Sequence, residues 1–330
     1  MILAGDVGGT KTFLARFKPS AEEPGPPLEA EMLPSQSFPS FEALLEDYLA
    51  RHPGSVKAVG LGVAGAVVNR SVRVTSLPWV IESDAVGTKL GLGADRVHVI
   101  NDLVATGHGL SAIGPSELEQ LQPGDADQEA CAGLIAAGTG LGETILVRVG
   151  VVHLPVPSEA GHADFAPRTD DELRVFHVLR ERYGRVSWER VLSGPGLVAL
   201  GEFFHRERGA TAEWARHLEE AGVNGPAEIV SRRGMARDCA ACEQALRLFV
   251  GVYGAEAGNL ALRAVARAGI YLGGGIAPKI LPALKWDVFL ESFRDKDHLR
   301  PLLSSIPVWV IRNELTGLLG AARYAALAEA

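Results

Sequence analysis

At 330 residues the chain is longer than one hydrophobic core usually serves, so we expect two domains. Hydrophobic residues make up 47% of the sequence and charged residues 22%, which is typical of a compact globular protein rather than a disordered one. The net charge of −8 and the scattered Lys and Arg residues argue against a nucleic-acid-binding surface. No stretch approaches the roughly 20 apolar residues of a membrane helix, and residues 1–3 lead into a strand-like run rather than a signal peptide. We therefore expect a cytoplasmic protein.

The first glycine-rich string occupies residues 5–12 and reads GDVGGTKT. It lies between two strand-like runs, residues 1–4 and 13–17, so it predicts a tight turn inside a β-hairpin. Glycine lets backbone N–H groups crowd against an anion, threonine adds a hydroxyl donor, and aspartate adds an oxygen ligand suited to hydrated Mg²⁺. The candidate phosphate-binding residues of this string are Gly5, Asp6, Gly8, Gly9 and Thr10.

Strands and helices alternate in the segment that follows. Ser40 caps a predicted helix with apolar residues at helical spacing, and residues 56–64, 71–76 and 97–100 predict strands. Apolar strands alternating with helices indicate an α/β sheet covered on both faces. Residues 60–65 match the dinucleotide fingerprint G-x-G-x-x-G, but a hairpin follows where that motif requires a helix, so we exclude dinucleotide binding there.

Asn101 and Asp102 follow the strand-like run 97–100 and precede a predicted helix. An aspartate in this place can simply cap the helix. However, ligands of α/β sheets bind at the carboxyl ends of the strands, where a carboxylate can take a proton from a substrate hydroxyl. Both interpretations stay open at this point.

A second glycine-rich string, residues 137–144, repeats the pattern of the first between strand-like runs at 133–137 and 145–149. The further candidate phosphate or nucleotide contacts are Gly138, Thr139 and Gly140 in this string, and Gly273, Gly274 and Gly275 at the end of a later strand-like run. Two phosphate clamps imply a nucleotide held from both sides, although a hairpin without chemistry also uses glycine. The recurrence suggests two copies of a related α/β unit.

A polar loop at residues 158–165 carries Glu159 and His162. The intervening Gly161 permits a tight bend, so the two side chains can converge on one small polar ligand, although the same residues could form a solvated turn. Glu189 stands in another polar string, residues 188–197, that decides nothing by itself.

Cys239 and Cys242 form a C-x-x-C pattern inside a predicted long helix, residues 236–267. Such a pattern has a metal or redox interpretation. The sequence shows no second cysteine pair and no neighbouring histidine pair, so we interpret the two cysteines as buried thiols.

In this order and at these separations, the strings resemble the bacterial ATP-dependent glucokinase family of the actin/hexokinase/Hsp70 superfamily. The resemblance covers essentially the whole chain and rests on residues 5–10, 100–103, 138–142, 159–167, 189–197 and 273–278. It implies a two-domain actin/hexokinase-like (ribonuclease H-like) α/β fold with duplicated α/β units around a central cleft. The small domain would be residues 1–102 plus about 313–330, and the large domain residues 103–312.

The resemblance also implies an activity, the transfer of the γ-phosphoryl group of ATP to the 6-hydroxyl of D-glucose, which is the first step of glycolysis. Asp102 would be the base that accepts the hydroxyl proton, Asp6 would lie near Mg²⁺ through water, and the third glycine string would lie against adenosine. The residues implied to ring the sugar are Asn101, Asp102, Glu159, His162 and Glu189, together with Ser76. We also expect a homodimer.

Two positions depart from the pattern of the family. Lys11 is common in the related family of bacterial repressors, open reading frames and sugar kinases (ROK), yet residues 165–190 lack the cysteines of the zinc motif of that family. Ser76 stands where glucokinases usually have asparagine, which puts one sugar contact in doubt. The alternatives are a kinase of another hexose, such as mannose or an amino sugar, and a catalytically reduced sugar-sensing regulator. The presence of both Asp6 and Asp102 favours an enzyme.

Overall fold

The computed structural model describes residues 1–19, 24–75, 77–222 and 225–329. Contacts within the chain divide it into two compact units. The first unit consists of Met1–Glu117, Val149–Pro157 and Asn313–Ala330, and the second of Leu118–Arg148 and Ser158–Arg312. Within the described residues, no helix is both long enough and apolar enough to cross a membrane.

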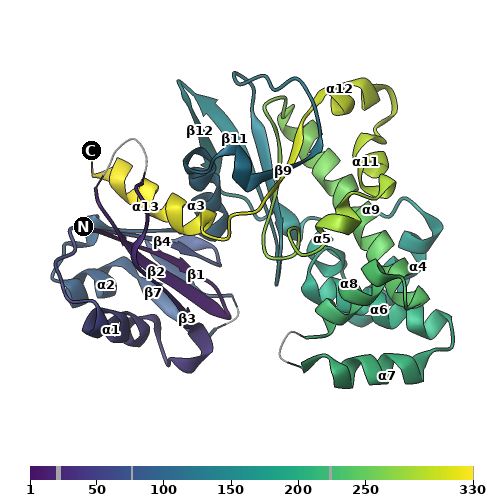
Figure 1. Cartoon of the computed structure of the whole chain (residues 1–330), viewed down its shortest axis with the longest axis horizontal. Coiled ribbons are helices and arrows are strands. Elements are labelled where there is room, and N and C mark those ends of the chain that lie inside the picture. The colour runs from purple at the N-terminus through teal and green to yellow at the C-terminus, as the bar shows by residue number, and fades with distance from the viewer. Residues whose placement is uncertain (20–23, 76, 223–224, 330) are drawn as a thin grey trace. The chain divides into compact units, whose positions relative to one another are not determined.

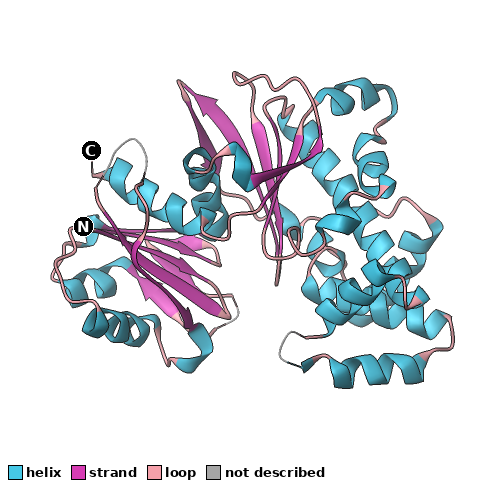
Figure 2. Cartoon of the chain, in the orientation of Figure 1, coloured by secondary structure: helices cyan, strands magenta, loops and turns pink. Residues whose placement is uncertain are grey.

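A five-stranded sheet organises the first unit (Figures 1 and 2). Its strands are β1 (Ile2–Val7), β2 (Lys11–Phe17), β3 (Leu28–Pro34), β4 (Ala58–Val63) and β8 (Val97–Asn101), in the order β3-β2-β1-β4-β8. β1 pairs antiparallel with β2 and parallel with β4, and β4 pairs parallel with β8. The predicted first hairpin is therefore confirmed.

Helices cover both faces of this sheet. They are α1 (Phe41–Arg51) and α2 (Ser83–Leu90) on one face, and α3 (Asp102–Gly109) and α13 (Thr316–Ala328) on the other. Along β1, Leu3 and Val7 belong to the core with α1, whereas Ile2 and Ala4 belong to the core with α13. This alternation follows from the period of two in a strand. The side chain of Ser40 accepts a hydrogen bond from the backbone of Ala43, which confirms the predicted cap of α1.

A small antiparallel sheet follows in the same unit. It has the order β5-β6-β7 and consists of β5 (Val67–Val68), β6 (Ser71–Arg73) and β7 (Val80–Glu82). The strand predicted at 71–76 is shorter than expected, because the backbone of Val74 turns to bond Trp79 instead of continuing the ladder. Ser76, the predicted sugar contact, lies outside the described residues.

The second large sheet repeats the strand arrangement of the first. Its strands are β9 (Leu118–Gln122), β10 (Ala132–Ala137), β11 (Leu141–Val149), β12 (Val152–Val156), β13 (Gly269–Gly273) and β14 (Val308–Ile311), in the order β12-β11-β10-β13-β14-β9. β10 pairs antiparallel with β11 and parallel with β13, and β13 pairs parallel with β14, as β1, β2, β4 and β8 do. The predicted duplication of an α/β unit is thus present in the topology.

The helices of the second unit gather around the central helix α9 (Figure 1). They are α4 (Asp170–Tyr183), α5 (Trp188–Val191), α6 (Gly194–Glu207), α7 (Thr211–Glu220), α8 (Pro226–Ala236), α9 (Ala240–Ala264), α10 (Leu281–Leu284), α11 (Asp287–Arg294) and α12 (Arg300–Ser305). The predicted helix 236–267 is wrong at its start, because Arg237 adopts a φ of +57° that ends α8, and Cys239 then caps α9.

Candidate functional site

The turn between β1 and β2 is held by hydrogen bonds of its own backbone and of Ser35, which directly follows β3. The N–H of Gly8 donates to the carbonyl of Lys11 at 3.0 Å, and the hydroxyl of Ser35 donates to the carbonyl of Gly8 at 2.8 Å. Gly5 lies inside β1, where an added Cβ would come within 2.9 Å of Leu61 and Leu14, so its lack of a side chain is explained by packing. Thr10 is exposed at the tip of the turn. Sequence reasoning missed Ser35, which no local pattern marks as part of the turn.

Asn101, rather than Asp102, is the cap of α3. Its side-chain oxygen accepts hydrogen bonds from the N–H groups of Leu103 at 2.9 Å and Val104 at 3.3 Å, and its amide donates to the carbonyl of Gly65 at 3.2 Å. Asp102 is the first residue of the helix and is half-buried, and its Oδ1 accepts from Leu103 at 2.9 Å. The capping interpretation that the sequence left open for Asp102 thus applies chiefly to its neighbour.

Asp6 and Asp102 act on one another electrostatically. Burial, together with the negative charge of Asp102, raises the pKa of Asp6 from 3.8 to about 7. The carboxylate of Asp6 also lies against the first turn of α13, where a Cβ on Gly317 would be 3.0 Å from its Oδ2. Two mutually repelling carboxylates are a donor set that suits a divalent cation with oxygen ligands. The residues therefore fit the predicted Mg²⁺.

The second hairpin, between β10 and β11, is tied to Glu189 and to the start of α6. Oε2 of Glu189 accepts the N–H of Leu141 at 3.0 Å, and a Cβ on Gly140 would lie 2.5 Å from that same oxygen. The N–H of Gly194 donates to the carbonyl of Gly138 at 2.8 Å. An added Cβ on Gly138 would meet nothing within 4 Å, so its position is open. Glu189, whose string decided nothing by itself, thus holds the hairpin.

The imidazole of His162 stands between two carboxylates of the second unit. Its Nδ1 is 3.9 Å from Oε2 of Glu159, and its Nε2 is 3.9 Å from Oε1 of Glu189. These separations exceed a hydrogen bond, and the side chains of His162 and Glu159 are 59% and 62% exposed. The three side chains can therefore accept and donate hydrogen bonds to the hydroxyls of a small ligand.

Gly161 fits this loop for a reason other than the predicted tight bend. A Cβ on Gly161 would lie 2.0 Å from the carbonyl oxygen of Leu141, so only glycine lets the loop approach β11 this closely. Arg185 braces the same loop, because its guanidinium donates to Asp164 at 2.7 Å and to the carbonyl of His162 at 2.6 Å. Sequence reasoning missed Arg185, which comes from a distant turn.

The third glycine string lies beside the second hairpin. Gly274 adopts a φ of +78°, and an added Cβ would lie 2.4 Å from the carbonyl oxygen of Ala137, the residue before Gly138. Gly273 ends β13, and an added Cβ on Gly275 would meet nothing within 4 Å. These glycines therefore present backbone without side chains at the edge where β10 and β13 end.

A buried acidic pair lies under the second hairpin. Glu143 of β11 and Glu256 of α9 are buried and share one cation, Arg263, whose Nη1 is 3.2 Å from Oε2 of Glu143 and 2.6 Å from Oε1 of Glu256. Burial, with the charge of Glu256, raises the pKa of Glu143. Arg263 therefore stabilises two carboxylates that would otherwise repel each other.

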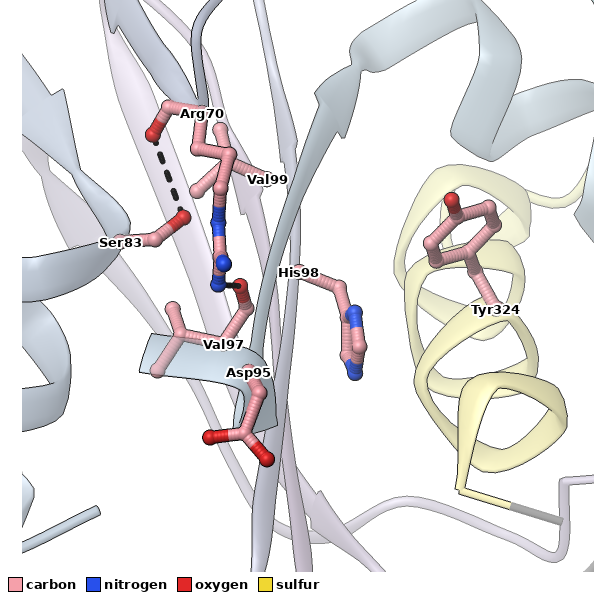
Figure 3. Close-up of a pocket in the computed structure, with 7 residues that line it drawn as sticks. All are labelled: Arg70, Ser83, Asp95, Val97, His98, Val99 and Tyr324. Carbon is pink, nitrogen blue, oxygen red and sulfur yellow. Dashed lines mark hydrogen bonds between the residues drawn. The ribbon is translucent and has the colours of Figure 1, made fainter. Parts of the chain in front are cut away.

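A pocket of the first unit does not coincide with these residues. It is lined by Arg70, Ser83, Asp95, Val97, His98, Val99 and Tyr324 (Figure 3). Arg70 forms hydrogen bonds with other residues that line the pocket. Its carbonyl accepts from the hydroxyl of Ser83 at 3.2 Å, and its guanidinium donates to the carbonyl of Val97 at 3.4 Å. None of the predicted site residues that the structure describes lines this pocket. We therefore assign no ligand to it.

Comparisons with known proteins agree with one family. The family model described as Glucokinase matches residues 3–328. A glucokinase of Nostoc punctiforme is 38% identical over an alignment of 342 positions, which covers 99% of each chain. The crystal structure of a glucokinase from an Antarctic psychrotroph has a TM-score of 0.80 and 26% identity, covering 100% of this chain and 99% of that one. A ROK family glucokinase from Streptomyces griseus in complex with glucose and AMPPNP shares the fold, with a TM-score of 0.66, 22% identity and 98% of each chain covered.

Proposed function

The chain belongs to the glucokinase family and is an ATP-dependent hexose kinase that phosphorylates glucose, and we propose that Asp102 is the base of this reaction. Asp102 would accept the proton of the sugar 6-hydroxyl as that oxygen attacks the γ-phosphorus in line. The observation that supports this role is the proximity of its charge to Asp6, next to the glycine turn of β1 and β2. A carboxylate in that place can both orient the hydroxyl and take its proton.

We propose that Glu159, His162 and Glu189 bind the sugar hydroxyls together with Asn101. The spacing of the first three supports this role. Nδ1 of His162 is 3.9 Å from Glu159 and Nε2 is 3.9 Å from Glu189, so the polar atoms stay able to bond a ligand. Asn101 and Asp102 belong to the first unit, and Glu159, His162 and Glu189 belong to the second.

The glycine turns of the two hairpins are proposed to bind the phosphates of ATP. The open positions at Gly138 and Gly275 support this role, because backbone without side chains can approach an anion closely. Asp6 would hold Mg²⁺ through water, and the ion when bound neutralises phosphate charge. The homodimer and the cytoplasmic location stay predictions.

Substitution of Asp102 by Asn tests the assignment of the base. The amide keeps the shape of the side chain but is a far weaker base, so glucose affinity should stay within about tenfold of wild type. The kcat should fall by about 10² to 10⁴, the usual contribution of general-base catalysis. Glu189→Gln, the matched control, should mainly raise KM, because it alters a proposed sugar contact rather than the proton acceptor.

Steady-state kinetics and calorimetric glucose titrations of both folded variants provide the measurement, with a panel of hexoses to define the preferred sugar. An Asp102→Asn enzyme that keeps more than about a tenth of wild-type kcat would refute the assignment, because general-base catalysis contributes more than that.

A further inference from the structure

Four buried side chains of the second unit, none of them assigned to the kinase reaction, bring metal-binding atoms together. They are His205 of α6, His217 of α7, and Cys239 and Cys242 at the start of α9. One donor atom from each lies within 4.8 Å of all the others. The sequence-based view that no histidine pair accompanies the C-x-x-C pattern is wrong. His205 lies 34 residues before Cys239 and His217 lies 25 residues before Cys242, and the fold brings each histidine to its cysteine.

The separations match those around one tetrahedral zinc ion. Sγ of Cys239 is 3.5 Å from Nε2 of His205, and Sγ of Cys242 is 3.9 Å from Nδ1 of His217. Zinc bonds of about 2.3 Å to sulfur and about 2.0 Å to nitrogen, at tetrahedral angles, place sulfur about 3.6 Å from nitrogen. The same geometry separates two sulfurs by about 3.8 Å and two nitrogens by about 3.4 Å. The largest separation allowed among the four donor atoms, 4.8 Å, therefore exceeds the separations around a bound zinc ion by about 1 Å. Side-chain rotation covers such a distance.

The outer contacts of His205 orient its ring for a metal. Its Nδ1 is 2.6 Å from the carbonyl oxygen of Gly201, and only a protonated nitrogen can bond a carbonyl. Nδ1 therefore carries the hydrogen, and the lone pair of Nε2 faces Cys239. A histidine ligand whose other nitrogen donates to a backbone carbonyl is the usual arrangement at protein metal sites.

His217 and Cys239 are also directed at the cluster. Nε2 of His217 faces Oε1 of Glu213 at 3.9 Å, which leaves Nδ1 directed at Cys242. The N–H of Cys242 donates to Sγ of Cys239 at 3.4 Å, so this sulfur caps the first turn of α9.

We propose that His205, His217, Cys239 and Cys242 bind one structural Zn²⁺ ion. Two thiolates and two neutral imidazoles form a ligand set that zinc prefers among common divalent ions. Two thiolates also balance the charge of Zn²⁺, which suits a buried place. Four protein ligands leave no open position for a substrate, so the site is structural rather than catalytic. Its ligands differ from the ROK zinc motif, whose cysteines would follow the loop of Glu159 and His162.

Such an ion explains how α7 is held. Within α7, all of whose residues are described, His217 is the only buried side chain, and Trp214 packs only partly against the core. Figure 1 shows α7 on the outside of the helices of its unit. Zinc bound by α6, α7 and α9 would replace the apolar contacts that α7 lacks.

Metal analysis of untagged protein, purified in reducing buffer without chelator, tests the proposal. Wild type should carry one Zn²⁺ per chain, and the Cys239→Ser/Cys242→Ser variant should carry at least tenfold less. Cys131→Ser removes the third free cysteine, which lies outside the cluster, so this matched control should keep its zinc. Equal zinc in wild type and in the double variant would overturn the proposal.

A second measurement avoids the variant altogether, in case it fails to fold. Full-length wild type, freed of metal by a chelator under reducing conditions and then titrated with Co²⁺, should show thiolate-to-metal charge transfer and the intense visible bands of a tetrahedral site. Chelation should also lower the Tm by about 5 °C or more. Wild type that carries no zinc and gives no such Co²⁺ spectrum would refute the proposal. A disulfide between Cys239 and Cys242 in the freshly purified protein would refute it as well.

Discussion

Ionisation of Asp6 should destabilise the protein when no ligand is bound. Burial and the charge of Asp102 raise the pKa of this carboxyl from 3.8 to about 7. Between these values the folded chain keeps a proton that the unfolded chain has released. The free energy of unfolding therefore falls as the pH rises from about 4 to about 7, and the loss is complete above that range.

The magnitude follows from the shift. About three pKa units at 1.36 kcal/mol each give about 4 kcal/mol in total, of which linkage places about 2 to 3 kcal/mol between pH 5 and pH 8. The carboxylate of Asp6 lies against the first turn of α13. The dipole of this helix offsets part of the repulsion between the ionised Asp6 and Asp102. We therefore expect a loss of about 2 kcal/mol over that interval.

Asp6→Asn isolates this effect, because asparagine has the same shape and does not titrate. Urea unfolding of both proteins, free of metal and nucleotide, should be followed by tryptophan fluorescence from about pH 5 to pH 8. Wild type should lose about 2 kcal/mol relative to the variant. The difference reports Asp6 together with its interaction with Asp102, and titrating groups that do not interact with Asp6 cancel because both proteins contain them. Added Mg²⁺ should stabilise wild type more than the variant at the upper end of the range. Stability profiles that stay parallel across the interval would refute the reasoning.

Further predictions concern the second hairpin, the sugar and the core. Gly140→Ala should raise the KM for glucose about tenfold, because the added Cβ would lie 2.5 Å from Oε2 of Glu189 and displace this proposed sugar ligand. Gly138→Ala lies in the turn proposed to bind phosphate, so it should change the KM for ATP and leave the KM for glucose unchanged; equal effects of both variants on the KM for glucose would contradict this. Arg263→Met should destabilise the protein by about 1 to 2 kcal/mol in chemical unfolding, since the buried pair of Glu143 and Glu256 loses its shared, partly exposed cation, and an unchanged midpoint would contradict this. Ser76→Asn should modestly lower the KM for glucose, because asparagine offers both an acceptor and a donor; a KM that rises or stays constant would place Ser76 outside the sugar contacts.

Local patterns in the sequence were enough to predict the main elements of the fold. The glycine strings predicted both hairpins because a tight turn between apolar strands is a short-range feature. The duplicated strand order followed from the repeated strings. The loop of Glu159 and His162 was also marked by its own composition.

Features that depend on contacts between distant segments could not be predicted. Gly161 is explained by the carbonyl of Leu141, and Arg185 braces the loop from a turn more than twenty residues away. The start of α9 depends on the positive φ of Arg237, which no propensity indicates for an arginine. The pairing of His205 with Cys239 required the packing of α6 against α9.

The place of α13 in the first unit has a consequence for the order of folding during synthesis. Leu318, Ala321 and Ala325 of this helix complete the core on one face of the first sheet, yet the whole of residues 118–312 is translated before them. At about 5 to 20 residues per second, that face waits on the order of 10 to 40 s for its covering helix to leave the ribosome. Meanwhile all residues of Leu118–Arg148 and Ser158–Arg312 become available. The second unit can therefore finish folding first, and the N-terminal sheet is the part of the nascent chain that needs protection from aggregation.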